Sequence, residues 1–149
     1  MANIDVQIAC AADALPSEDQ LQHWCKTALK AAGRDGALAL RISDAKEIQT
    51  LNQQYRNKNN STNVLSFPSD LPAELGLDEL GDIIMCAEVI AREAVEQNKN
   101  ADDHWAHMVI HGTLHLCGYD HIDDKEAEEM EALETQILAT LGINNPYLA

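Results

Sequence analysis

Residues 81–118 read GDIIMCAEVIAREAVEQNKNADDHWAHMVIHGTLHLCG, and this stretch decides the fold. Its first part, GDIIMCA, is a short apolar run typical of a buried strand. Helical spacing then predicts two helices, one over about 88–99 and one from 102 or 103 to 117. Gly118 ends the second helix, because glycine readily adopts the left-handed conformation that reverses the chain there. A strand followed by two helices predicts a sheet with helices packed on it.

The remaining sequence supplies further strands and helices. Alternating apolar residues predict three strands, over 3–10, 37–42 and 62–67, the last stopped by Pro68. Apolar residues at helical spacing predict three helices, one from a Ser17 capping box to Gly33, one over 44–55 and one over 124–141. The order βαβαββααα suggests an α/β (α+β) fold. We expect a single domain over residues 1–149, with one small mixed four-stranded sheet and about five helices packed on it.

Composition and charge exclude several classes of protein. The chain is 46% hydrophobic and 23% charged, which is typical of a globular protein and excludes disorder. No apolar run approaches the roughly 20 residues that span a bilayer, and no signal peptide is expected, so we expect a cytoplasmic protein without a membrane partner. The net charge of −15 opposes non-specific binding to nucleic acid, and no DNA partner is expected. The four dispersed cysteines are expected to be reduced.

Histidines concentrate in one segment of the chain. Five of the six lie between residues 104 and 121, in a run that includes HGTLHLCGYDH over 111–121. His111 and His115 are four residues apart, so both imidazoles lie on one face of the predicted helix. This geometry suits two ligands of one metal ion. A turn at Gly118 can bring His121 to the same ion. Three neutral imidazoles are a familiar zinc set that leaves the fourth position open for water.

The spacing matches the HExxHxxGxxH pattern of metzincin proteases except at one position, where Gly112 replaces the glutamate. That glutamate is the general base of those proteases, so peptide hydrolysis by their mechanism has no obvious base here. A closed structural zinc site would instead need a fourth protein ligand, and Asp120 or Cys117 could supply one. Cys117 should point elsewhere on the helix, since it lies only two residues from His115. We therefore favour an open site.

The run HGTLHLCGYDH resembles the H-G-x-L-H-L-x-G-Y-D-H signature of the YbeY family, bacterial endoribonucleases and rRNA maturation factors. A second motif is also similar to that family, with LNxxYRxK over 51–58 followed by TNVLSFP over 62–68. GDI at 81–83 and EAExMEAL at 126–133 fit as well. One departure lies at 59–63, where NNSTN stands in place of the family's frequent Asp-x-Pro-Thr-Asp.

The resemblance implies an α/β fold with one zinc ion held by His111, His115 and His121. It also implies that Arg56 is a functional arginine near the metal, which makes Arg56 and His115 the candidate catalytic residues. Histidine ligands do not separate zinc from nickel or another divalent metal. The implied substrate is RNA, with roles in 16S rRNA 3′-end maturation, ribosome assembly and 70S quality control. The implied partners are rRNA, the small ribosomal subunit, a ribosomal protein and an assembly GTPase.

Three further residues are candidates for contacts near the metal or the substrate. His107 lies at helical spacing from the ligands, as a partner of a ligand imidazole or as a packed histidine. Asp120 could fix the tautomer of a ligand imidazole or could cap the following turn. Ser66 could bind phosphate or water, or it could be an ordinary strand serine.

Three functions compete on these observations. The first is a single-strand-specific, zinc-dependent endoribonuclease in rRNA processing. The second is a metalloprotease-like hydrolase, and the third is a non-catalytic ribosome-assembly factor with a structural zinc.

Four of the ten basic residues lie close together in the sequence and form a candidate RNA-binding patch, the alternative being an ordinary solvated face. They are Arg41, Lys46, Arg56 and Lys58.

Overall fold

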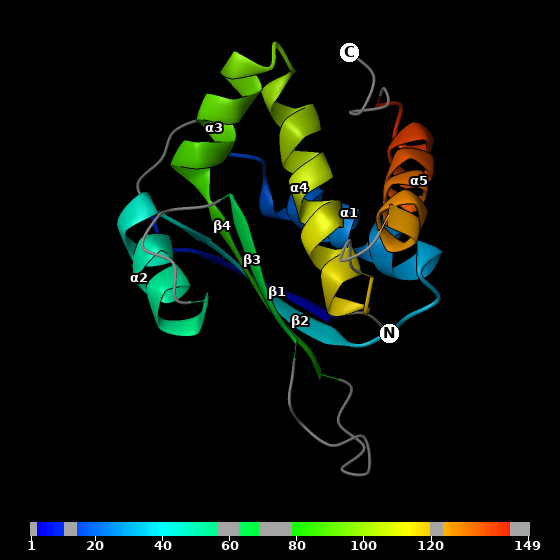
Figure 1. Cartoon of the computed structure of the whole chain (residues 1–149), viewed down its shortest axis with the longest axis horizontal. Coiled ribbons are helices and arrows are strands. Elements are labelled where there is room, and N and C mark those ends of the chain that lie inside the picture. Colours follow the sequence, from blue (N-terminus) through cyan, green and yellow to red (C-terminus); the bar gives the residue numbers. More distant parts are fainter. Residues whose placement is uncertain (1–2, 11–14, 57–62, 69–78, 120–123, 144–149) are drawn as a thin grey trace.

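The structure is a computed structural model that describes residues 3–10, 15–56, 63–68, 79–119 and 124–143. Its strands and helices run in the predicted order (Figure 1). The strands are β1 (Asn3–Ile8), β2 (Ala37–Ser43), β3 (Val64–Pro68) and β4 (Glu79–Cys86). The helices are α1 (Glu18–Ala31), α2 (Ala45–Arg56), α3 (Ala87–Glu96), α4 (Ala101–Leu116) and α5 (Asp124–Thr140).

The four strands form one mixed sheet in the order β1-β2-β4-β3, which confirms the predicted fold class. β1, β2 and β4 are parallel, whereas β3 pairs antiparallel with β4 at the edge of the sheet. Helices α1 and α4 cover one face of the sheet, α5 packs against both of them, and α2 covers the other face (Figure 1). The side chains of β4 alternate accordingly: Ile83 and Met85 join the larger core, while Ile84 and Cys86 face α2.

The predicted capping box of α1 is confirmed. The Ser17 hydroxyl accepts from the backbone N–H of Gln20 at 3.1 Å, and the Gln20 side chain accepts from the Ser17 N–H at 3.0 Å. At the other end of the helix, Gly33 has a φ of 68°. These local signals hold α1 in the orientation that packs Trp24 and Leu29 into the core.

Several boundaries differ from the prediction: β1 ends at Ile8 rather than at Cys10, and β4 begins at Glu79 rather than at Gly81. Two other differences have a clear physical reason. β3 includes Pro68, which pairs with Gly81, because an edge strand tolerates a residue without an N–H donor. α3 ends at Glu96 rather than near Lys99, since Asn98 adopts a left-handed φ of 54° that a helix cannot continue through.

α4 is the central helix of the fold. Eleven of its sixteen residues are buried between the sheet and the helices around it. Its first turn is capped by Asn100, whose side-chain oxygen accepts from the N–H groups of Asp102 and Asp103 at 2.9 and 3.3 Å. Because α4 is buried on nearly all sides, its polar residues must find partners inside the protein.

Two further predictions concern cysteines and membranes. Cys10, Cys25, Cys86 and Cys117 all lie in the described residues and all are free thiols. Among the described residues, no helix has the length and apolar character needed to cross a bilayer.

Candidate metal centre

Four histidines form a row along one face of α4. The ring centroids of His104 and His107 are 6.3 Å apart, those of His107 and His111 are 6.3 Å apart, and those of His111 and His115 are 4.6 Å apart. The spacing of three and four residues produces this row, since these positions are neighbours on a helix surface. His104 and His107 are buried, and His111 and His115 are half-buried at the last turns of the helix.

The predicted ligand pair is brought together at the C-terminal end of α4. The Nε2 atoms of His111 and His115 lie 3.1 Å apart. Two nitrogens bound at about 2.0–2.1 Å to a tetrahedral zinc ion would be about 3.3 Å apart, so the pair fits one ion. Just beyond the pair, Gly118 has a φ of 98° and reverses the chain as predicted.

The third predicted ligand, His121, and the neighbouring Asp120 lie outside the described residues. Within residues 3–10, 15–56, 63–68, 79–119 and 124–143, no group of three or more His, Cys, Asp and Glu is arranged to hold a metal. Arg56 is the last residue of α2, and its side chain also lies outside the described part. The structure thus places His111 and His115 together. The third ligand, His121, and the candidate phosphate-binding residue, Arg56, remain predictions.

A carboxylate that the sequence analysis missed lies behind this pair. Glu134 of α5 is fully buried, with 0% of its surface exposed. Its Oε1 is 2.6 Å from Nδ1 of His111, and its Oε2 is 2.8 Å from Nε2 of His107. When Glu134 is ionised its oxygens only accept hydrogen bonds, and each of these ring nitrogens then donates an N–H. The Nδ1–H of His111 leaves the lone pair of Nε2 directed toward the expected ion.

His107 is therefore placed as a partner of Glu134 rather than in contact with solvent. The available sequence signal for Glu134 is its position on the apolar stripe of the last helix. It lies four residues after Met130 and three before Ile137, both of which are buried. An acid on a core-facing stripe is uncommon unless it has a buried partner.

A second, partly buried network lies at the other end of the histidine row. His104 Nε2 is 3.0 Å from Oε1 of Glu93, and the amide of Asn63 donates to the same carboxylate at 3.2 Å. This network joins the start of β3 to α3 and α4. Asn63, which stands where the family frequently has an aspartate, is a hydrogen-bond donor here. An amide can donate to Glu93, whereas an ionised carboxylate at the same position could not.

Burial lowers the pKa of His104, and the neighbouring Glu93 only partly opposes this effect. The folded protein therefore favours neutral His104 more than the unfolded chain does, and the resulting stability is lost as the pH falls below the ordinary histidine value of about 6.5. We predict that the unfolding free energy of the wild type falls more steeply between pH 7 and pH 5 than that of His104→Gln. Urea unfolding across this range measures both slopes. The other groups around His104, namely Glu93, Lys99 and His107, remain in both proteins, so equal slopes would contradict the prediction.

At Gly112, α4 packs tightly against the sheet. A Cβ atom there would lie 3.0 Å from Cγ2 of Ile83 and 3.2 Å from Cγ2 of Val64. A hydrogen bond joins β3 to α4 at the same place: the Ser66 hydroxyl donates to the carbonyl of Gly112 at 3.1 Å. The position that carries the glutamate in metzincins therefore faces the sheet here, and a side chain there would press on Ile83 and Val64.

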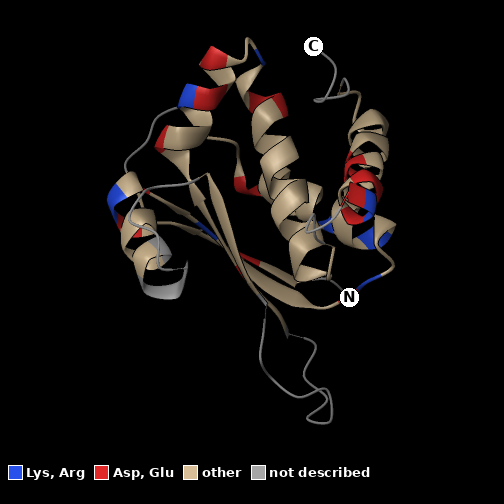
Figure 2. Cartoon of the chain, viewed as in Figure 1, with Lys and Arg blue, Asp and Glu red and all other residues tan. Residues whose placement is uncertain are grey.

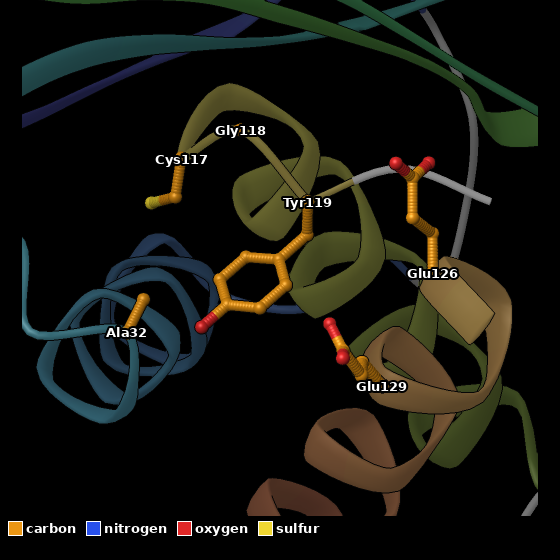
Figure 3. Close-up of a pocket in the computed structure, with 6 residues that line it drawn as sticks. All are labelled: Ala32, Cys117, Gly118, Tyr119, Glu126 and Glu129. Atoms are coloured by element: carbon orange, nitrogen blue, oxygen red, sulfur yellow. The ribbon is translucent and has the colours of Figure 1, made fainter. Parts of the chain in front are cut away.

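A cavity of about 350 Å³ lies next to the end of α4, lined by Ala32, Cys117, Gly118, Tyr119, Glu126 and Glu129 (Figure 3). Cys117 points into the space beside α1, and burial raises the pKa of its thiol, which disfavours it as a metal ligand. The two glutamates would repel a phosphate group, so this cavity is a poor candidate for RNA.

The candidate basic patch is weakened by internal pairing. Arg41 forms a two-pronged ion pair with Glu47, at 2.5 and 3.1 Å, which balances its charge. Lys58 lies outside the described residues. Figure 2 shows ribbon coloured for Asp and Glu on both α3 and α5. On α5, Glu126, Glu128 and Glu131 are exposed. The described surface is therefore dominated by negative charge, as the composition indicates.

Fold and site together define an α/β protein with a candidate metal centre on its central helix. Over residues 7–142 the sequence matches the family described as Endoribonuclease YbeY, and the chain belongs to this endoribonuclease family. Members of the family are nucleases that act on RNA in ribosome maturation. The chain is also similar to a protein of Thermotoga maritima, TM1509, also called VT1, whose structure was determined in solution. The similarity covers 100% of both chains, with 23% identity and a TM-score of 0.58, and it supports the fold alone.

Proposed function

We propose that this chain is a zinc-dependent endoribonuclease that cuts single-stranded RNA and matures the 3′ end of 16S rRNA, with roles in ribosome assembly and 70S quality control. The family supports RNA cleavage in ribosome maturation. The observation that carries the metal part of the proposal is the His111–His115 pair, whose facing Nε2 atoms lie 3.1 Å apart. The proposed partners are the small ribosomal subunit, a ribosomal protein and an assembly GTPase.

His111, His115 and His121 would hold one zinc ion, and nickel or another divalent metal suits the same imidazole set. When bound, the metal supplies polarisation of a phosphoryl oxygen and lowers the pKa of a water molecule toward about 7. The protein's own contribution is to orient the imidazoles. α4 fixes their spacing, and Glu134 keeps the proton of His111 on Nδ1.

Arg56 would stabilise negative charge on the phosphate, because a guanidinium group forms paired hydrogen bonds with phosphate oxygens. Its position at the end of α2 supports this role only together with the family motif around it. We predict that Arg56→Lys lowers the cleavage rate about 100-fold, since lysine keeps the positive charge but cannot form the paired hydrogen bonds of a guanidinium group. Arg92→Lys on the exposed surface of α3 is the control and should retain full activity. Full activity of Arg56→Lys would exclude a phosphate clamp at this residue.

A protease-like hydrolase is the second candidate because the histidine spacing is shared. Gly112 argues against it, since the general base of that mechanism is absent and its position on the helix packs against Ile83 and Val64 of the sheet.

Three substrates test the proposed activity in parallel: a single-stranded rRNA 3′-end fragment, the same fragment paired with its complement, and a generic peptide. We expect cleavage of the single-stranded RNA only. Peptide hydrolysis without RNA cleavage would favour the protease, and equal cleavage of both RNAs would contradict single-strand specificity.

We also infer a cytoplasmic location. The free thiols at Cys10, Cys25, Cys86 and Cys117 and a ribosomal substrate both support it.

A further inference from the structure

A buried carboxylate needs a physical reason to be retained in a core. Glu134 has none of its surface exposed, and it lies among the apolar residues of α5 that dock on α4 and the larger core. Removing a carboxylate from water is costly unless hydrogen bonds replace the lost hydration. The two oxygens of Glu134 meet two different imidazoles, at 2.6 and 2.8 Å.

The two bonds have different consequences. The bond to His111 fixes the proton on Nδ1, which keeps Nε2 unprotonated and facing Nε2 of His115. The bond from His107 holds the second oxygen and so limits rotation of the carboxylate. His107 is itself 7% exposed, so water does not compete freely for this bond.

We propose that Glu134 is a positioning residue for the metal, which orients His111 for binding and is itself oriented by His107. The proposal rests on the proposed binding of zinc at His111 and His115. Because Glu134 comes from α5 and both imidazoles come from α4, it makes the affinity for the metal depend on how these two helices dock. Met130 and Ile137, buried on either side of Glu134 along α5, fix that docking.

The test compares Glu134→Gln with Glu131→Gln in the full chain. Glutamine has nearly the same shape but carries no charge, and its amide can accept from only one of the two imidazoles. Glu131 is exposed one turn earlier on the same helix, which makes it the matched control. Zinc affinity is measured by competition with a chelator. We expect about 10–100-fold weaker binding in Glu134→Gln and unchanged binding in Glu131→Gln.

A second measurement does not depend on the variants or on bound metal. Long-range nitrogen–proton NMR of the metal-free wild type reports which ring nitrogen of His111 carries the proton. We expect the proton on Nδ1, whereas a proton on Nε2 would overturn the positioning role even if Glu134→Gln failed to fold.

The outcomes separate this proposal from the proposed function. If the wild type binds zinc and Glu134→Gln binds it equally well, the positioning role is wrong and the zinc site stands. If the wild type binds no zinc, the metal part of the proposed function is wrong, and the positioning role toward a metal is wrong with it.

Discussion

A His115→Ala variant is expected to bind no zinc and to cleave single-stranded RNA at least about 1,000-fold more slowly than the wild type. A metal contributes several kcal/mol to the stabilisation of transition-state charge, and each 1.36 kcal/mol is a factor of ten in rate. His115 lies at the end of α4 and is half-buried, so its removal leaves the core around Leu114 and Ile110 intact. Cleavage kinetics and metal content, determined on identically purified proteins, measure both effects.

His23→Ala is the control for this variant. His23 is an exposed histidine on α1, far in sequence from the histidine row, and its loss should change neither zinc content nor rate. Equal cleavage by His115→Ala and the wild type would identify the activity as a contaminant. A folded His115→Ala protein that still supports ribosome maturation would favour the non-catalytic factor with a structural zinc.

Gly112→Ala is expected to destabilise the fold by about 1–3 kcal/mol. In an exposed helix, alanine would be about 1 kcal/mol more favourable than glycine. Here the new Cβ would lie 3.0 Å from Cγ2 of Ile83 and 3.2 Å from Cγ2 of Val64, next to the Ser66–Gly112 hydrogen bond, so these side chains must shift in a packed contact. Urea unfolding measures the difference from the wild type.

Gly112→Glu, which completes the protease pattern in the sequence, is expected to be more destabilising than Gly112→Ala and to hydrolyse no peptide. It would force a carboxylate into the same contact. Ala132→Gly at an exposed position of α5 is the control, since it reports helix propensity alone. A Gly112→Ala protein as stable as the wild type would contradict the packing argument, and peptide hydrolysis by Gly112→Glu would revive the protease interpretation.

The order of elements and the fold class could be predicted because local signals agree with the global fold. The alternation around Leu38 and Leu40, the Ser17 cap and the turn glycines at 33 and 118 all depend on neighbours in sequence. The boundaries at Pro68 and Asn98 could not be predicted in the same way. One depends on which strand lies at the edge of the sheet, and the other on a single left-handed residue.

The proximity of His111 and His115 could be predicted for the same reason. His111 and His115 lie one helical turn apart, so their spacing in sequence is enough to bring them together. Glu134 is 23 residues away from His111, and only the docking of α5 on α4 brings the two into contact. The tight packing of Gly112 could not be predicted either, because its neighbours Ser66 and Val64 lie on a strand more than 40 residues earlier in the sequence.

The measurement that tests the central claim most directly is a zinc titration of RNA cleavage. The wild type is stripped of metal with a chelator, the chelator is removed, and the cleavage rate on the single-stranded 3′-end fragment is followed as zinc is added. We predict no cleavage by the metal-free protein, a rate that rises in proportion to bound zinc, and a plateau at about one equivalent, as expected of one three-histidine site. Cleavage that is already complete without metal, or that is unchanged when zinc is bound, would contradict a metal-dependent endoribonuclease.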